Sequence, residues 1–266
     1  PEESNYLMQR ANLYYETGNY DLSDDDYERM AQLDKDNFNP YMGLGRNAMA
    51  REDYDRAVTF FDRVVQLAPE FNYGYSYRAE AHLLRRDYPH AVEDCTSALS
   101  LLWDDVDVRA YQVFRTLCDS AATTLRARLK VLHNKEPQKQ KWLYYLYSLE
   151  DHLGNYGRAA NYYFKEYQLS PTAQSALNLA DKLASLNLHD AALMWQARAE
   201  NHDSKNIDAP LLAAVLHMKK GNFNEANAAL ERAIALDAEN PDIYKNYGQL
   251  NSERENRSEE RRVGKE

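Results

Sequence analysis

The segment Gly154-Asn-Tyr-Gly-Arg-Ala-Ala-Asn-Tyr-Tyr-Phe164 decides the fold of this chain, because close variants of it recur at regular intervals. Each variant has a turn-forming pair, then an aromatic residue, and usually an alanine three residues later. The aromatic residues are Tyr20, Tyr54, Tyr88, Tyr156 and Phe223. Their spacings are 34, 34, 68 and 67 residues, which a single repeat of about 34 residues explains. The chain is therefore predicted to be a stack of repeated units, each packed on its neighbours.

The repeat register divides most of the chain into successive units. Their predicted ranges are 4–37, 38–71, 72–105, 106–139, 140–172, 173–206 and 207–240, followed by a partial unit at 241–252. Three prolines support this register, since Pro69, Pro137 and Pro171 are 68 and 34 residues apart. Residues 1–252 are thus predicted to form one solenoid, and residues 253–266 a disordered tail.

Within each unit, the placement of small residues predicts two closely packed helices. On the first helix these residues are Ala11, Gly45, Ala79, Ala180 and Ala214, and on the second they are Ala57, Ala91, Ala159, Ala192 and Ala226. Small side chains at a crossing point let two helix backbones approach each other. Gly18, Gly154 and Gly221 fall where the first helix must end, because glycine accepts the left-handed backbone that closes a helix.

The second unit carries the resemblance to a known family. It contains Tyr41-x-x-Leu44-Gly45-x-x-Ala48, then Ala57-x-x-x-Phe61, and then Pro69. This pattern resembles the tetratricopeptide repeat, with tyrosine in place of the usual tryptophan. The resemblance implies an all-α, right-handed superhelical solenoid of antiparallel helix pairs, with about seven repeats and a partial eighth. It also implies a non-enzymatic scaffold that binds a peptide segment of a partner protein in its concave groove.

The fourth unit, 106–139, departs from this pattern. Val113, Ala122 and Leu125 stand where the other units have the small crossing residue, the aromatic residue and the second-helix alanine. Its apolar spacing still predicts helices. The unit is interpreted as a degenerate repeat, and the alternative is a break in the solenoid near residues 133–141, with the segment from His133 to Pro137 as the joint.

Composition restricts the partners and the compartment. Of the 266 residues, 44% are hydrophobic and 28% charged, and the formal net charge is −10. An acidic chain is unsuited to binding phosphates, so nucleic acid is not an expected partner. No apolar run reaches the roughly 20 residues that span a bilayer. The chain is expected to be soluble, in the cytoplasm or the periplasm, with Cys95 and Cys118 as free, buried thiols.

No motif for catalysis, a cofactor or a metal stands out. Gly43-Leu-Gly45-Arg-Asn-Ala48 matches a dinucleotide-binding fingerprint, but no strand precedes it and Gly45 is assigned to helix packing. The seven histidines occur singly, without the spacing of a metal or catalytic motif. His82 and His217 occupy a first-helix position usually given to tyrosine, so they are expected to serve packing. The chain is predicted to have no catalytic, cofactor or metal-ligating residues.

The predicted binding surface is the groove lined by the first helices of the units, which the family resemblance implies. Carried over by position, its residues are Asn12, Tyr15, Met42, Arg46, Met49, Tyr73, Ser76, Tyr144, Ser148 and His152. Methionine and tyrosine beside asparagine and arginine suit an adaptable peptide groove, although exposed helix faces also carry such mixtures. These side chains are expected to be at least partly exposed, with Leu44, Gly45, Ala57 and Phe61 buried.

One ligand class known for the family is not expected. The clamp that holds chaperone C-terminal carboxylates requires lysine, asparagine and arginine at positions that here read Met8, Asn12, Gly43, Tyr73 and Tyr77. Of these residues, Asn12 alone matches the clamp. The partner is therefore an unidentified protein or peptide. The basic segment at 126–141 is a second candidate contact, either with an acidic partner or, through self-association, with the acidic segment at 21–36 of another copy.

The last ten residues, Arg257-Ser-Glu-Glu-Arg-Arg-Val-Gly-Lys-Glu266, lie outside the repeat register. They resemble a translated sequencing adaptor on a bacterial metagenomic fragment, which implies that the natural protein continues past about residue 256 and that this tail makes few contacts. The alternative is an ordinary charged tail. A second functional hypothesis follows, in which the chain is the repeat region of a larger protein whose enzymatic or regulatory domain lies outside this sequence.

Overall fold

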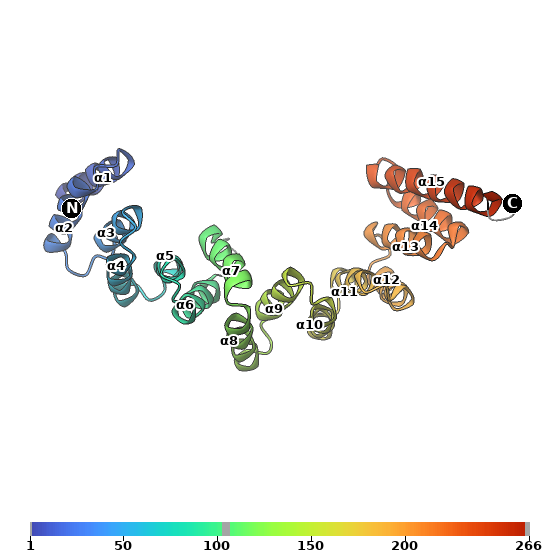
Figure 1. The fold of residues 1–266 in the computed structure, drawn as a ribbon, viewed down its shortest axis with the longest axis horizontal. Helices are drawn as coiled ribbons and strands as arrows, with labels where there is room; N and C mark the ends of the chain where they lie inside the picture. Colours follow the sequence, from blue (N-terminus) through green and yellow to red (C-terminus); the bar gives the residue numbers. More distant parts are fainter. Residues whose placement is uncertain (1, 103–106, 264–266) are drawn as a thin grey trace. The chain divides into compact units, whose positions relative to one another are not determined.

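The computed structural model describes residues 2–102 and 107–263, and these residues are helical throughout apart from short turns (Figure 1). No β-strand occurs in the described ranges, so the predicted all-α class is confirmed. The helices are α1 (Glu2–Glu16), α2 (Tyr20–Leu33), α3 (Asn39–Ala50), α4 (Tyr54–Leu67), α5 (Asn72–Leu84), α6 (Tyr88–Leu101), α7 (Val108–Ser120), α8 (Ala122–Lys135), α9 (Gln140–His152), α10 (Tyr156–Leu169), α11 (Ala173–Ser185), α12 (His189–His202), α13 (Asp208–Lys220), α14 (Phe223–Leu236) and α15 (Pro241–Val263). Each predicted full unit contains two of them.

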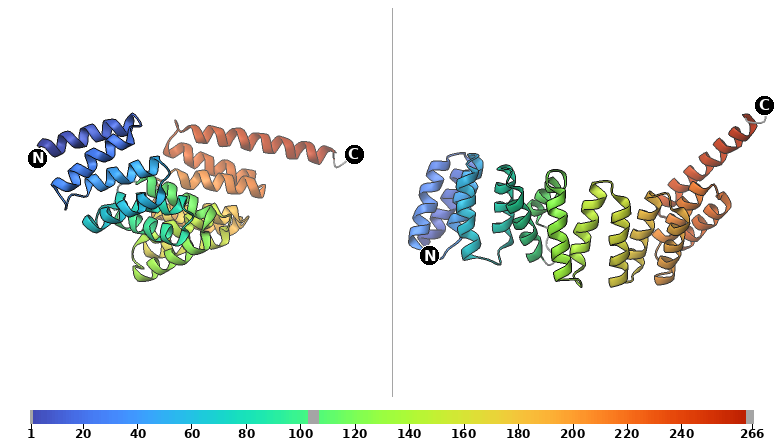
Figure 2. Two further views of the ribbon diagram at one scale, coloured as in Figure 1. Left: turned by 60° about the vertical axis from the view of Figure 1, so that its left-hand side comes forward. Right: turned by 60° about the horizontal axis from the view of Figure 1, so that its bottom comes forward.

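The chain forms two compact units, Pro1–Leu132 and His133–Glu266, here named unit 1 and unit 2. In unit 1, helices α1 to α6 pack on their neighbours in sequence order, and α7 packs on both α5 and α6. In unit 2, α9 to α14 pack in sequence order and α15 packs on α13 and α14 (Figure 2). The boundary between the units falls beside the segment His133 to Pro137, where the sequence offered a joint as the alternative to an unbroken solenoid.

In six helix pairs, the two helices are joined by the same type of turn. The N–H of the residue just before the second helix donates to a carbonyl five residues earlier, for example from Asn19 to Tyr14 and from Asp87 to His82, both at 2.8 Å. This hydrogen bond is the mark of a helix that closes through a left-handed residue. Gly18, Gly154 and Gly221 have φ of 76°, 70° and 76°, as predicted.

In the other three turns, a residue other than glycine adopts the same left-handed backbone conformation. These residues are Glu52, Arg86 and Asn187, with φ of 61°, 62° and 59°. This conformation costs a non-glycine residue roughly 1–2 kcal/mol. Replacing Arg86 with glycine is therefore expected to raise the free energy of unfolding by about 0.5–1 kcal/mol, after the added unfolded-state entropy of glycine is subtracted. Urea denaturation followed by circular dichroism measures the change.

Arg85 provides the control, since it is also exposed but has φ of −73°. Arg85→Gly should lower stability by roughly 0.5–1 kcal/mol, as glycine does at ordinary helical positions. The effect at Asn187 should be smaller than at Arg86, because asparagine tolerates the left-handed region better. An Arg86→Gly protein that unfolds at lower urea than the unsubstituted chain would contradict the strain argument.

The fourth helix pair differs in its turn. A single residue, Ala121, separates α7 from α8, and its φ of −143° lies outside the left-handed region. The sequence there lacks both the glycine and the aromatic residue of the other turns. Its apolar series is nevertheless buried, with Val113, Leu117, Leu125 and Leu129 all at most 3% exposed. The helical interpretation of this unit is correct for the described residues, and residues 103–106 lie outside them.

Packing between paired helices depends on the predicted small residues. All nine of the predicted crossing alanines are fully buried, at 0% exposure. Gly45 lies against the Phe61 ring, and a methyl group added at Gly45 would overlap that ring. Gly43 faces the Tyr27 ring in the same way. The glycines of the fingerprint Gly43 to Ala48 thus serve helix packing inside α3 (Asn39–Ala50), as the sequence predicted for Gly45.

The C-terminal segment corrects one prediction. α15 (Pro241–Val263) continues through residues 253–263, which the sequence predicted to be disordered. Ile243 and Leu250 anchor the helix by full burial, and the Glu- and Arg-rich residues that follow are good helix formers. The tail also contacts the body, since Arg254 donates to the Phe223 carbonyl at 3.0 Å and the Arg257 guanidinium lies 5.3 Å from the Phe223 ring centroid.

None of the described helices combines the length and the apolar content that crossing a lipid bilayer requires.

Candidate functional site

Two adjoining clefts lie in unit 1 along the first helices of its pairs. One cleft, of about 470 Å³, is lined by Tyr15, Arg46, Met49, Ala50, Glu52, Tyr54, Tyr77, Glu80, Leu84 and Arg109. The other, of about 430 Å³, is lined by Glu80, Leu83, Leu84, Arg86, Tyr88, Arg109, Gln112, Val113, Thr116 and Ser120. The clefts adjoin at Glu80, Leu84 and Arg109, and the two together, here named the groove, border α1, α3, α5 and α7.

One end of the groove is built on a stacked arginine. The Arg46 guanidinium from α3 lies 4.4 Å from the centroid of the Tyr15 ring on α1. Such cation–π contacts contribute about 0.5–1 kcal/mol at exposed sites and hold the side chain in one direction. Arg46 forms no ion pair with any described residue, so its positive charge is available to a ligand.

The middle of the groove has a second stacked arginine, but this one is neutralised. Arg109 from α7 lies 3.8 Å from the centroid of the Tyr77 ring and forms an ion pair with Glu80 from α5. Tyr77 itself packs on Phe61, with ring centroids 5.4 Å apart. The groove wall is therefore fixed by the same buried phenylalanine that fills the helix crossing at Gly45.

The structure brings three of the predicted binding residues, Tyr15, Arg46 and Met49, into the groove. Met42 is half-buried and packs on the core cluster around Phe61. Asn12 is also half-buried, and its side-chain oxygen accepts a hydrogen bond from the Tyr27 hydroxyl at 2.8 Å. Tyr73, which is 43% exposed, lines neither of the two clefts.

The prediction for Ser76 is wrong. Ser76 is fully buried, and its hydroxyl donates to the Tyr73 carbonyl at 3.2 Å within α5. A serine side chain is too short to reach past its neighbours from this helix position, and bonding to its own helix backbone satisfies the hydroxyl. Ser76 therefore offers no surface for a ligand.

The other three predicted residues belong to unit 2. Tyr144, Ser148 and His152 lie on α9, where Tyr144 and His152 are exposed and Ser148 is half-buried. The Tyr144 ring makes edge contacts with Tyr145 and Tyr147, at centroid distances of 5.2 and 5.4 Å. Of these three rings, Tyr144 is exposed, Tyr145 is half-buried and Tyr147 is buried.

Several groove residues were not among the predicted set, notably Tyr54, Tyr77 and Arg109. Arg109 was not predicted because it belongs to the degenerate fourth unit. The family pattern is too weak in that unit to assign groove positions. Its pairing with Glu80 joins residues 29 positions apart. The available signal was the opposite charge of two residues on successive first helices.

The two cysteines carry no reactive thiol in the folded chain. Cys95 and Cys118 are free and buried, as predicted. Burial raises the pKa of the Cys118 thiol to about 12, and it raises the pKa of Cys95 further. Both thiols therefore stay protonated near neutral pH.

A second group of titratable side chains lies away from the groove, on α5, α6 and the turn between them. His82, Asp87 and His90 converge there, although the sequence predicted no metal-ligating residues. Burial lowers the pKa of His82, whereas the hydrogen bond to Asp87 raises the pKa of His90. A neighbouring hollow is lined by Asp62, Arg78, His82, His90, Glu93 and Asp94 together with Val58, Tyr75 and Ser97.

Solved structures resemble this chain in fold. The C-terminal part of a tetratricopeptide-repeat-containing protein from Cytophaga hutchinsonii shares 14% identity with a TM-score of 0.50, and the match covers 90% of this chain and 98% of that one. The TPR protein YrrB, described as having an unusual peptide-binding site, shares 16% identity over 82% of this chain and 96% of its own, with a TM-score of 0.40. A complex of the TPR2AB domain of yeast Sti1 with pHSP90 shares 16% identity over 94% and 97%, also with a TM-score of 0.40.

Sequence models of a protein family match more than half of the chain. Two models, both described as tetratricopeptide repeat, match residues 42–106 and 211–260 in one case and residues 4–37 in the other. These ranges include helix pairs of both units, and the antiparallel pairs, the small crossing residues and the left-handed turns described above agree with them. The chain belongs to the tetratricopeptide repeat family.

Proposed function

We propose that this chain is a protein-interaction scaffold that binds an extended peptide segment of a partner in the groove of unit 1. The observation that carries the proposal is that two clefts adjoin through Glu80, Leu84 and Arg109 and together cross four helices. Adjoining clefts along successive helices suit an extended segment, which advances about 3.3–3.6 Å per residue. A compact small molecule would fill one cleft alone.

The lining residues support a peptide ligand. Tyr15, Tyr54 and Tyr77 supply aromatic surface, and Arg46 supplies a charged anchor. Tyrosine and arginine are enriched among the residues that dominate binding energy at protein interfaces. Since Arg46 is held against Tyr15 in the free chain, little side-chain entropy is lost when a ligand engages it.

The charges of the groove favour one acidic residue in the ligand rather than an acidic run. Arg46 is without an ion-pair partner among the described residues, whereas Glu80 already neutralises Arg109. Glu80 and Glu52 both line the cleft and would repel further negative charge. We infer a peptide with a single carboxylate at the Arg46 end and apolar or aromatic residues beyond it.

We infer further that the scaffold is non-enzymatic. None of the described residues that line the clefts is a histidine or a cysteine, so these residues do not supply the usual base or thiol nucleophile. Among the titratable residues that do line them, Arg46 and Arg109 stack on tyrosine rings and Glu80 forms an ion pair with Arg109. The lining therefore serves recognition.

Replacing Arg46 with glutamate is expected to weaken peptides that carry the single carboxylate by about tenfold to a hundredfold. The reason is the loss of a charge-assisted hydrogen bond of roughly 1.5–3 kcal/mol, to which repulsion is added. Peptides would be selected from a random display library with the unsubstituted chain, and their dissociation constants measured by fluorescence anisotropy.

Arg56→Glu is the matched control, because Arg56 is exposed on α4 and lines neither cleft. It makes the same change in net charge and should leave the dissociation constants within about twofold. Equal binding by the two variants, or a library that yields no groove-binding peptide, would show that the groove is not the binding site.

A further inference from the structure

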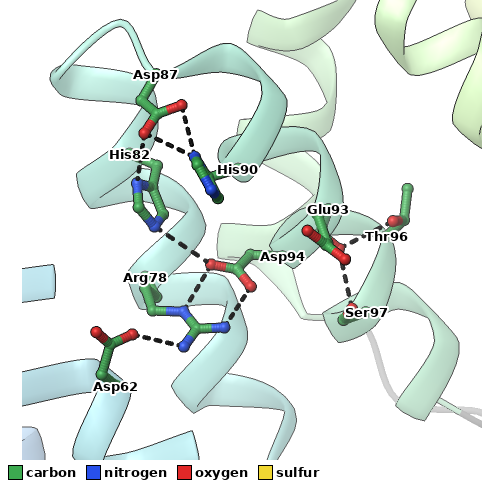
Figure 3. Close-up of polar contacts among 9 residues, drawn as sticks. All are labelled: Asp62, Arg78, His82, Asp87, His90, Glu93, Asp94, Thr96 and Ser97. Carbon is green, nitrogen blue, oxygen red and sulfur yellow. Dashed lines mark hydrogen bonds and ion pairs between the residues drawn. The ribbon is translucent and has the colours of Figure 1, made fainter.

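The three converging side chains come from consecutive parts of one helix hairpin. His82 lies near the end of α5, Asp87 is the residue just before α6, and His90 lies in the first turn of α6 (Figure 3). Nδ1 of His90 is 2.8 Å from Oδ2 of Asp87, and Nδ1 of His82 is 3.5 Å from the same oxygen. The three ligand-type atoms all lie within 4.8 Å of one another.

The buried member of this cluster has a polar atom that the protein leaves unsatisfied. His82 is 8% exposed, and its Nδ1 has no hydrogen-bond partner among the described residues. Buried polar atoms are almost always hydrogen-bonded, so an exception calls for an explanation. An ordinary surface ion pair explains why Asp87 and His90 lie together. It does not explain why Nδ1 of His82 is buried without a hydrogen bond.

We propose that His82, Asp87 and His90 form a binding site for a divalent transition-metal cation of the Zn²⁺ type. The ligands are Nδ1 of each histidine and one carboxylate oxygen of Asp87. Zinc lies about 2.0–2.2 Å from such atoms, which in tetrahedral geometry places neighbouring ligands about 3.3 Å apart. The separations from Asp87, 2.8 and 3.5 Å, lie within about half an ångström of that value, and the two histidine ligand atoms lie within 4.8 Å of each other.

A second layer of side chains supports His82 in this role. Its other ring nitrogen, Nε2, is 3.8 Å from Oδ2 of Asp94 (Figure 3). Asp94 is held by two hydrogen bonds from Arg78, at 2.7 and 2.6 Å, and Arg78 also bonds Asp62 at 2.7 Å. A histidine that binds a metal usually directs its second nitrogen toward a carboxylate, which fixes the ring orientation.

The ligand set selects the class of ion. Two imidazoles and one carboxylate suit zinc, cobalt, nickel and copper, whereas magnesium and calcium prefer oxygen ligands alone. The thiols take no part, because the Cys95 sulfur is buried and contacts the Ala110 carbonyl. The His90 side chain is 64% exposed and that of Asp87 29%, which leaves room for water as the remaining ligand.

The experiment uses the full chain, first treated with a chelator and then titrated with Zn²⁺ alone or Co²⁺ alone. Calorimetry is expected to show one equivalent of tightly bound metal. Bound Co²⁺ should show the visible absorption of a low-symmetry, nitrogen- and oxygen-ligated site without a thiolate charge-transfer band. Because the metal binds the folded hairpin, the thermal unfolding midpoint should rise with Zn²⁺ concentration.

His90→Gln and Asp87→Asn should each lower the affinity for Zn²⁺ at least tenfold and remove the rise in unfolding midpoint. Both side chains are partly or largely exposed, so the variants should fold. Asp94→Asn should lower affinity about tenfold to a hundredfold through the second layer. The control is His202→Gln, an exposed histidine in unit 2, which should bind as the unsubstituted chain does.

Two results would overturn the proposal. One is a titration in which the unsubstituted chain binds no Zn²⁺ or binds it only weakly at several equivalents. The other is a single site whose affinity is unchanged in His90→Gln and Asp87→Asn, or equally reduced in His202→Gln.

Discussion

Replacing Phe61 with alanine is expected to lower the free energy of unfolding by about 3–5 kcal/mol, as truncations of buried phenylalanine do. Phe61 is fully buried, and its ring fills the space that Gly45 leaves at the crossing of α3 and α4. It also supports Tyr77 in the groove wall. The truncation would leave a cavity in the core cluster that Phe61 forms with Ala48, Ala57 and Val64. Urea denaturation followed by circular dichroism measures the loss.

Leu33→Ala is the control in the same unit. Leu33 lies at the end of α2 and is 54% exposed, so its truncation should change stability by no more than about 0.5 kcal/mol. A Phe61→Ala protein that loses less than about 1 kcal/mol would mean that this crossing is not closely packed. In a repeat protein the loss is expected to act on the local helix pairs first, because each pair depends on its neighbours.

Replacing Trp142 with alanine should lower the free energy of unfolding of unit 2 by a similar amount, about 3–5 kcal/mol. Trp142 is fully buried on α9, with Leu143 and Leu146 equally buried on the same helix. Its Nε1 donates to Oε2 of Glu136 at 2.8 Å, which satisfies the one polar atom of the ring. Amide hydrogen exchange along α9 and α10 would locate the loss, since it does not rely on tryptophan fluorescence.

Trp142→Phe separates packing from hydrogen bonding. Phenylalanine keeps most of the apolar area and loses the bond to Glu136, a carboxylate near the surface, so the cost should be less than half that of alanine. Equal destabilisation by Phe and Ala would assign the effect to the hydrogen bond instead. The exchange rates of α9 amides distinguish the two results.

Much of this fold could be predicted from local sequence. Gly18, Gly154 and Gly221 adopt the predicted left-handed conformation, because no other residue enters that region without strain. The crossing alanines are buried as expected, because only small side chains let two helix backbones approach closely. Both features are decided by residues within one repeat, so the repeat period was sufficient to find them.

The binding residues were predicted less completely. Tyr15, Arg46 and Met49 line the groove, but Ser76 is buried and Arg109 was missed. A residue's position in the repeat pattern predicts which face of the helix it occupies. It does not predict whether a short side chain on that face reaches the surface. Nor does it apply to a unit that has lost the pattern, as the fourth has.

The sequence by itself determined the helical repeat, its period and the turns, because each depends on residues that are close along the chain. Tertiary structure decided which charges are free and which side chains meet. Arg46 has no ion-pair partner in the described part of the chain, whereas Arg109 is neutralised by Glu80 on another helix. His82 meets His90 because the left-handed turn at Arg86 folds α6 back onto α5. No helical or strand periodicity places residues 82, 87 and 90 together, so this cluster exists only once the hairpin has closed.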